Sequence, residues 1–389
     1  MVPFVLWGSI GLLVHTYVVF PLVVLARGRL RARPLCTGEL LPRLSVVIAA
    51  HDEAASIGAK LRTVLDSDYP VERMEVVVAS DGSTDETAAI VRGWPDRRVH
   101  GLELGRVGKA AALNAALDAT DDPEVVVFTD ANSLLERTAL RALVRPFADP
   151  EVGGVAGDQR YLPPEGRPDA HGERSYWGFG RAMKLAQSRA GNVIGATGAL
   201  YAVRAELVPP VADGVTDDFT TSTAVIAAGR RLVFCPEAVA WEPVAPSTSH
   251  EFERKVRVMT RGLRGVAARR ELLDVRRHGF YAYQLATHKV LRRLMGVPLL
   301  GLVAASFANR RRSPLHRAIA GVQLTAYAAG AVGLVAPRTV LGRTRPCQLA
   351  AYFCMVNAAG VVAATNVVRG RRVAQWDTAR TSAPLVVAP

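Results

Sequence analysis

Cysteine is scarce in this sequence. Four occur among 389 residues, and no two of them form a C-x-x-C pair. Zinc sites and redox centres built on paired cysteines need such spacing, and a disulfide framework needs more closely grouped residues. We therefore expect four unpaired, structural cysteines and no redox chemistry. They are Cys36, Cys235, Cys347 and Cys354.

Acidic residues are also in deficit. Lys and Arg number 48 against 35 Asp and Glu, which gives a net charge of +13 and a pI near 10.1. Such a balance is typical of proteins that meet nucleic acid, anionic lipid or a phosphorylated substrate. The sequence contains no recognisable nucleic-acid-binding module, so we expect no nucleic-acid partner. The basic residues gather beside apolar runs, as at the cytoplasmic flanks of membrane helices.

Charge is nearly absent from the first apolar run. Residues 2–25 are long enough to span a bilayer. A cleaved signal peptide is the alternative, but in a signal peptide the basic residues precede the apolar run, and here they follow it. We therefore expect a retained transmembrane helix over residues 1–26, with its C-terminal end in the cytoplasm. The basic residues are Arg27, Arg29, Arg31 and Arg33.

Three further apolar stretches follow residue 278, and they contain few ionisable residues. They predict a C-terminal membrane region over residues 278–372, followed by a tail over 373–389. The alternative, helices buried in a soluble core, fits poorly because there are several such stretches. A transporter or sensor would need more ionisable residues in these stretches. The stretches are residues 291–308, 318–336 and 348–368, of which the first is interrupted by Pro298.

The topology has two readings. If all four segments span, the loop at 310–312 and the tail at 369–372 lie outside, against the positive-inside tendency. If the first C-terminal stretch lies only at the membrane interface, the loop at 310–312 and the tail at 369–372 are both cytoplasmic. The basic loop at 338–345 then lies outside. We favour spanning, and expect a multi-pass protein of the cell membrane.

Between these regions, residues 41–270 have the pattern of an α/β domain. Apolar, β-branched runs at 44–50, 76–79 and 125–129 predict buried strands, and helical patterns separate them. This alternation predicts a mostly parallel sheet, whose ligands bind at the carboxyl ends of the strands.

Carboxylates follow the predicted strands. Asp52, Asp81 and Asp130 each come at a strand end, so the fold can bring them into one crevice. Lys109 follows the glycine-containing turn 105–108 at a helix start, where a phosphate is stabilised. A nucleotide-diphosphate donor needs such groups: a carboxylate for the nucleoside, a counter-charge for the phosphates and a second carboxylate to deprotonate the acceptor. Each feature alone is weak, since a lone Asp-Gly is usually only a turn.

Taken together and in order, these segments resemble glycosyltransferase family 2. Residues 44–53 are similar to its opening strand and donor turn, residues 80–85 to its D-G-S-x-D element, and residues 108–114 to G-K-x-x-x-L-N. Further along, 128–132 resembles the D-x-D motif and 198–201 the acceptor-side glycine segment. Residues 216–218 resemble T-E-D, and 254–258 stand where membrane-bound members carry Q-x-x-R-W.

The resemblance covers roughly residues 44–262 and implies a GT-A catalytic domain, here over residues 41–270 on the cytoplasmic side. The sequence is similar to the membrane-bound branch of this family, which includes cellulose synthase-like, hyaluronan synthase-like and poly-N-acetylglucosamine synthase-like enzymes. It implies Asp218 as general base, with Gly198 and Asp217 on the acceptor side. A divalent ion, Mg²⁺ or Mn²⁺, would be held by Asp130 and Asn132. The donor-binding residues that it implies are His51, Asp52, Glu53, Asp81, Lys109, Asp130, Arg254 and Arg257.

The sequence departs from the family's motifs at three positions. Asn132 replaces the second Asp of D-x-D, and a neutral amide oxygen holds a divalent ion more weakly than a carboxylate. Arg254 replaces the Gln of Q-x-x-R-W, and Val258 replaces its Trp. In polymerising members that Trp helps hold the acceptor sugar, so Val258 favours transfer of one or a few sugars.

The resemblance therefore implies an inverting glycosyltransferase that moves a sugar from a nucleotide-diphosphate donor, UDP by family default, to a glycan or lipid-linked acceptor. Cell-envelope polysaccharide or glycolipid synthesis is the expected setting. The alternatives are a polysaccharide synthase that extrudes its product, single-sugar transfer to a polyprenyl phosphate, and a non-catalytic sugar-binding subunit of an envelope assembly complex. The joint presence of Asp81, Asp130 and Asp218 argues against the last.

Overall fold

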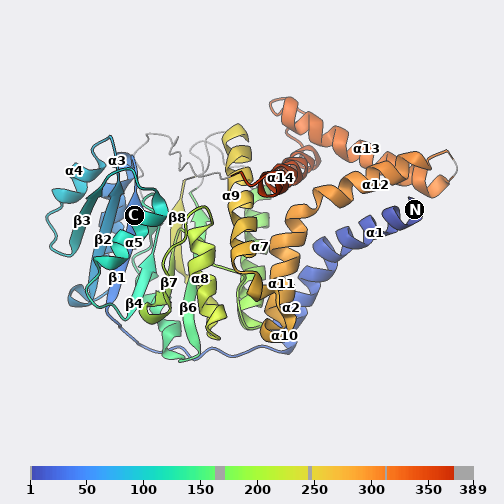
Figure 1. Ribbon diagram of the computed structural model, residues 1–389. Coiled ribbons are helices and arrows are strands. Elements are labelled where there is room, and N and C mark those ends of the chain that lie inside the picture. The colour runs from blue at the N-terminus through green and yellow to red at the C-terminus, as the bar shows by residue number, and fades with distance from the viewer. Residues whose placement is uncertain (1, 163–170, 244–247, 312, 372–389) are drawn as a thin grey trace. The chain divides into compact units, whose positions relative to one another are not determined.

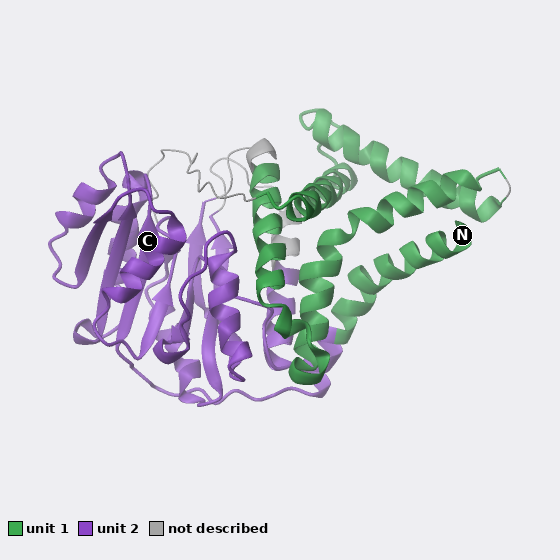
Figure 2. Ribbon diagram, viewed as in Figure 1, with its two compact units in different colours: residues 1–23, 247–373 green, residues 24–246, 374–389 purple. Residues whose placement is uncertain are grey.

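A computed structural model describes residues 2–162, 171–243, 248–311 and 313–371, with the backbone alone at 171–177 and 248–250. The expected tail, residues 373–389, lies outside the described residues. The chain divides into two compact units (Figures 1 and 2). Unit 1 contains Met1–Val23 and Ser247–Val373, and unit 2 contains Val24–Pro246.

Unit 2 is built on an eight-stranded sheet with the order β3-β2-β1-β4-β7-β6-β8-β5. The strands in chain order are β1 Leu44–Ala50, β2 Met74–Asp81, β3 Val99–Leu104, β4 Val125–Phe128, β5 Leu134–Leu135, β6 Val152–Tyr161, β7 Tyr201–Arg204 and β8 Arg231–Glu242.

The first four of these strands, β1 to β4, run parallel. Ala50 of β1 lies beside Ser80 of β2, and Val47 lies beside Phe128 of β4, so the carboxyl ends of these strands meet at one edge. Every residue of β1 is buried, which explains its unbroken apolar run. The strand expected over 44–50 is confirmed, and those expected over 76–79 and 125–129 are confirmed within a few residues.

The other half of the sheet is mixed. Strand β7 is antiparallel to both β4 and β6, β8 is parallel to β6, and β5 is antiparallel to β8. Four of the seven strand pairings are parallel, so the predicted α/β class is confirmed.

The helices of unit 2 cover both faces of this sheet, as Figure 1 shows. The helical patterns expected between the strands are present: α3 ends at Leu65, and α5 opens with Lys109. Helix α4 starts two residues after Asp85. The helices are α3 Ala54–Leu65, α4 Thr87–Arg92, α5 Lys109–Asp118, α6 Ala139–Val144, α7 His171–Arg189 and α8 Asp217–Ala227.

Unit 1 is helical in the part that the structure describes, and α1 packs on α12 through Leu6, Leu302 and Ala305. Three helices are long and apolar enough to cross a membrane, namely Val2–Leu30, Pro314–Val335 and Arg345–Val368. Its helices are α1 Val2–Val14, α9 Thr248–Ala268, α10 Val275–His278, α11 Phe280–Leu285, α12 Gly296–Ala308, α13 Pro314–Val335 and α14 Arg345–Val368. Helix α2, Phe20–Leu30, continues α1 after a π-helical segment, His15–Val19.

The first C-terminal stretch is the irregular one, as its sequence suggests. Helical segments over Phe280–Leu294 and Gly296–Ala308 meet at a bend of 53°, and only the bent pair together has the length and composition of a span. The chain therefore has three candidate spans among its described residues, or four if the bent pair is one span.

Candidate active site

The turns that follow β1 and β2 are locked together within unit 2. Asp52 adopts a left-handed conformation with φ of 50°, and its Oδ1 accepts a hydrogen bond of 2.7 Å from the Thr84 N–H. His51 Nδ1 lies 2.8 Å from the carbonyl oxygen of Asp81. A non-glycine residue in this conformation is strained, and such strain persists where surrounding contacts hold it. The predicted donor turn is therefore preformed against its neighbour.

Glu53 completes this turn from inside the protein. Its side chain is buried at 5% exposure and accepts from the Ser56 hydroxyl at the start of α3. Its N–H donates to Thr87 Oγ1 at 2.8 Å. Glu53 therefore supports the turn from behind.

Asp81 lies at the end of β2 and is fully buried. Its Oδ1 accepts from the N–H groups of Val107 and Gly108, at 2.7 and 2.8 Å, and its Oδ2 accepts from Arg106 Nη1 at 2.6 Å. Gly108 has φ of 93°, a conformation that favours glycine. Asp81 thus holds the turn that precedes α5. Arg106 lies within the turn 105–108 but was not among the predicted site residues.

Lys109 joins two of the predicted carboxylates. Its Nζ lies 2.9 Å from an Asp130 oxygen and 2.9 Å from an Asp217 oxygen. Burial alone would lower the pKa of Lys109, but the charges of Asp130 and Asp217 outweigh it and raise that pKa above its ordinary value. The three residues come from α5, from the loop after β4 and from the first turn of α8. The fold therefore brings these three residues into contact.

Gly198 lies on the other side of Asp130. The Asp130 N–H donates to the Gly198 carbonyl at 3.0 Å, and a Cβ added at Gly198 would come within 2.6 Å of Asp130 Oδ2. A side chain at position 198 would displace the carboxylate, so glycine is required by this close approach.

Asn132 offers a second oxygen next to Asp130. Its side chain is 7% exposed, and its buried amide oxygen has no hydrogen-bond partner among the described residues. The same residues contain no cluster of three His, Cys, Asp or Glu side chains able to hold a metal ion. Mg²⁺ and Mn²⁺ sites of nucleotide enzymes often use one or two protein oxygens and complete the shell with phosphates and water. The Asp130 carboxylate and the Asn132 amide oxygen fit that kind of site.

Asp218 follows Asp217 in the first turn of α8, where the helix dipole stabilises a negative charge. Its Oδ1 accepts from the Phe219 N–H at 2.7 Å. The phenol of Tyr201 is buried nearby, and burial, together with the charges of Asp217 and Asp218, raises the pKa of Tyr201 well above its ordinary value. Asp218 is thus an acidic group at the edge of the cluster around Lys109.

Lys60 is a second buried lysine that the sequence analysis missed. It is fully buried, and its Nζ donates to Thr129 Oγ1 at 2.6 Å. Burial lowers the pKa of Lys60 to about 7, although Asp130 and Glu242 act in the opposite direction. A signal was present, because Lys60 falls on the apolar face of α3 with Ile57, Leu61 and Val64.

Two predicted donor-binding residues, Arg254 and Arg257, lie on α9 in unit 1. Arg254 Nε pairs there with Glu251 at 2.9 Å. The contact of these arginines with a pyrophosphate stays a prediction.

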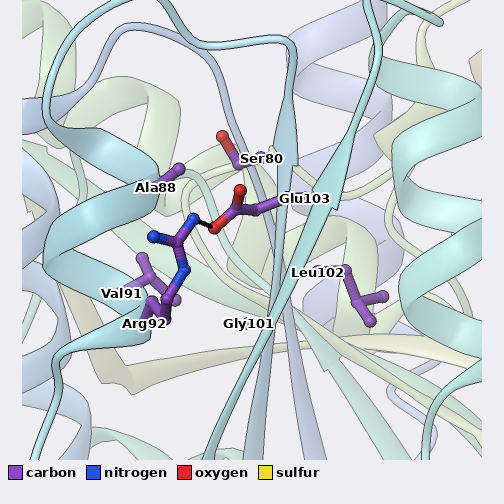
Figure 3. Close-up of a pocket in the computed structure, with 7 residues that line it drawn as sticks. All are labelled: Ser80, Ala88, Val91, Arg92, Gly101, Leu102 and Glu103. Atoms are coloured by element: carbon purple, nitrogen blue, oxygen red, sulfur yellow. Dashed lines mark hydrogen bonds and ion pairs between the residues drawn. The ribbon is translucent and has the colours of Figure 1, made fainter.

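A cavity of about 240 Å³ lies over β2, β3 and α4 (Figure 3). Arg92 and Glu103 form an ion pair at this cavity. Ser80, which also lines the cavity, directly precedes Asp81 in the chain. The residues that line it do not include the carboxylates described above, so we do not assign the site to it. They are Ser80, Ala88, Val91, Arg92, Gly101, Leu102 and Glu103.

Known proteins resemble this chain in sequence and in fold. The family model described as "Glycosyltransferase like family 2" matches residues 42–265. Beta-monoglucosyldiacylglycerol synthase of Synechocystis sp. is 35% identical over 133 residues, which are 32% of this chain and 28% of that protein. Poly-beta-1,6-N-acetyl-D-glucosamine synthase of Staphylococcus epidermidis is 25% identical over 222 residues, 55% of this chain and 53% of that protein. The chain thus matches only about a quarter to a half of these relatives' length.

Among solved structures, the mannosyltransferase PcManGT from Pyrobaculum calidifontis resembles most of the chain. It was solved in complex with GDP-Man and Mn²⁺. The two proteins are 25% identical with a TM-score of 0.73, and the match covers 94% of this chain and 99% of that one.

Proposed function

The chain belongs to glycosyltransferase family 2, and we propose that it is a membrane-embedded, inverting enzyme that moves a sugar from a nucleotide-diphosphate donor to a glycan or lipid-linked acceptor. It is a glycosyltransferase with the GT-A fold. One observation carries the proposal: Lys109 links Asp130 and Asp217, and the unpartnered amide oxygen of Asn132 belongs to the same turn as Asp130. This arrangement suits a diphosphate with a divalent ion.

In the proposal, the nucleoside binds at the paired turns after β1 and β2. His51 and Asp52, supported from behind by Glu53, form one wall, and Arg106, held by the buried Asp81, forms the other. Because these turns are already hydrogen-bonded to each other, little ordering entropy is lost when the donor binds. GDP-Man in the similar mannosyltransferase supports a nucleotide-diphosphate sugar as donor.

The diphosphate would lie at Lys109, Asp130 and Asn132, where α5 begins and its N–H groups favour an anion. A divalent ion held there by Asp130 and Asn132 would neutralise charge that builds on the departing diphosphate. Lys109 would supply a further positive charge, with Arg254 and Arg257 as proposed pyrophosphate contacts.

Asp218 is the proposed general base. It would take the proton from an acceptor hydroxyl, whose oxygen attacks the anomeric carbon from the face opposite the diphosphate. The bond to the diphosphate breaks as the new glycosidic bond forms, so the anomeric configuration inverts. Gly198 and Asp217 would shape the acceptor side, since both contact groups of the same cluster.

The acceptor is proposed to be met at the membrane. Three candidate spans, with a fourth if the bent pair counts, support a multi-pass protein of the cell membrane, with a cytoplasmic catalytic domain over residues 41–270. Relatives named for a glycolipid and for a polysaccharide product support a glycan or lipid-linked acceptor. Val258 favours a second candidate within the same chemistry, transfer of one sugar to a polyprenyl phosphate, because the Trp of polymerising members is missing there.

Release of nucleoside diphosphate by the detergent-purified protein tests this proposal. The assay uses a panel of UDP- and GDP-sugars with membrane lipid extract as acceptor, with and without Mn²⁺. We expect release from one donor, loss of that release on chelation, and a lipid-soluble product with one or a few sugars. Long polymer would favour the extruding synthase. Donor binding without release from any donor would contradict the proposal.

A further inference from the structure

The buried ammonium group of Lys60 has no part in the mechanism above. Its side chain lies between α3 and the end of β4, at 0% exposure. Burial of a lysine costs free energy, and a hydrophobic residue of similar size usually packs at least as well. A lysine at this position therefore needs a reason other than packing.

Lys60 begins a hydrogen-bond relay that ends behind Asp130. Its Nζ donates to Thr129 Oγ1 at 2.6 Å, and that hydroxyl donates to the Ala199 carbonyl, also at 2.6 Å. The Thr129 hydroxyl gives its single proton to the Ala199 carbonyl, so it accepts from the Lys60 amino group, which has N–H donors in either protonation state. Ala199 follows Gly198, which packs on the Asp130 carboxylate. The relay joins the two segments that hold Asp130.

The far end of the same turn is also held. Ser133 Oγ donates to Glu242 Oε1 at 2.9 Å. The charges that act most on Lys60 are those of Asp130, within the turn, and of Glu242, which accepts from Ser133. Residues 129–133 are thus fastened at both ends, and the unpartnered amide oxygen of Asn132 lies in the middle.

We propose that Lys60 is a positioning residue that fixes the 129–133 turn, so that Asp130 and Asn132 present their oxygens together to a divalent ion and the donor diphosphate. The inference rests on the proposed function for the identity of the ligand. Lys60 itself acts only through Thr129 and touches neither the donor nor the ion.

Three variants of the full chain in detergent test this role. Lys60→Met keeps the approximate length of the side chain and removes its hydrogen-bonding amino group. Thr129→Val removes the hydroxyl in the middle of the relay. Leu61→Met is the matched control, because Leu61 is the next buried residue of α3. Three quantities are measured: the Mn²⁺ dissociation constant in the presence of GDP or UDP, by electron paramagnetic resonance; KM and kcat for the donor; and Tm.

For Lys60→Met we expect Mn²⁺ affinity and donor kcat/KM to fall roughly tenfold, the size of one lost positioning hydrogen bond. The Tm should stay level or rise, since a buried charge is removed. Thr129→Val should weaken Mn²⁺ binding similarly, and the double variant should bind no more weakly than the single variants. Leu61→Met should leave Mn²⁺ affinity unchanged.

Wild-type Mn²⁺ affinity in a folded Lys60→Met variant would overturn the inference. The inference would also be overturned if Lys60→Met and Leu61→Met both lost Mn²⁺ affinity in step with a fall in Tm. That pattern would show that Lys60 contributes only to packing. If the wild-type protein turns over no donor, the proposed function fails, while the Mn²⁺ measurement still decides whether Lys60 positions the turn.

Discussion

The carboxylate of Asp130 packs directly on the α-carbon of Gly198, so closely that an added Cβ would lie 2.6 Å from Oδ2. The Gly198 carbonyl also accepts the Asp130 N–H. One glycine thus sets both the backbone and the side chain of the proposed metal ligand. The contact explains in physical terms why a glycine suits the acceptor-side segment.

Gly198→Ala should cut donor turnover at least about tenfold, because the methyl group displaces Asp130 and overpacking of this kind costs about 1–3 kcal/mol. Mn²⁺ titration of the turnover rate measures the effect. Gly178→Ala on α7 is the control, since this glycine is exposed and nothing lies within 4 Å of a Cβ there. Equal activity of both variants would show that the close contact between Gly198 and Asp130 does not affect turnover.

Lys109→Met should destabilise the protein by roughly 3 kcal/mol, because it leaves two partly buried carboxylates, Asp130 and Asp217, without their shared cation. Nucleotide binding should weaken as well. Thermal unfolding and nucleotide titration measure the two effects. The matched control is Arg92→Met, which breaks the exposed pair with Glu103 and should cost less than about 1 kcal/mol. Similar costs for both variants would contradict this account of Lys109.

Asn132→Asp should tighten metal binding. A second carboxylate beside Asp130 adds a full negative charge to the proposed site, so half-maximal activity should need several-fold less Mn²⁺. In the absence of metal the added charge lies at a position that is only 7% exposed and repels Asp130, which should lower Tm. A metal requirement that does not change would place the ion elsewhere.

Lys60 predicts a pH dependence of stability. Its folded-state pKa of about 7 lies below the ordinary value of 10.5. Between these values the unfolded chain holds a proton that the folded chain has released, so stability rises with pH. The slope is at most about 1.4 kcal/mol per pH unit. Tm in the wild type should therefore rise above neutral pH, and Lys60→Met should lose that rise. Equal slopes of Tm against pH in the two proteins would contradict the lowered pKa of Lys60.

The parallel half of the fold could be predicted because its signals are local. The strand over 44–50 is an almost wholly apolar run between polar residues, and Asp52, Asp81 and Asp130 each come at the end of such a run. The antiparallel strand β7 could not be predicted. It has four residues, and its insertion between β4 and β6 depends on pairings distant in sequence.

The site residues divide in the same way, into those that local motifs identify and those whose contacts are distant in sequence. Lys109, Asp130 and Asp217 were recognised from their motifs, and the structure brings them into contact. Helical spacing could have placed Lys60 on the apolar face of α3. Its partner Thr129 is 69 residues away, so the relay was visible only in three dimensions. Likewise, nothing local shows that Asp81 is held by residues 106–108.

Asp218→Asn tests the central claim most directly, with Asp217→Asn as its neighbour control. Donor binding and sugar transfer are measured on the same purified samples. Loss of the proposed base should lower kcat roughly 10²–10⁴-fold with donor affinity little changed. Asp217→Asn should instead weaken donor binding, because it disturbs the pair with Lys109. Near-normal turnover of Asp218→Asn would show that this carboxylate is not the base and would contradict the account.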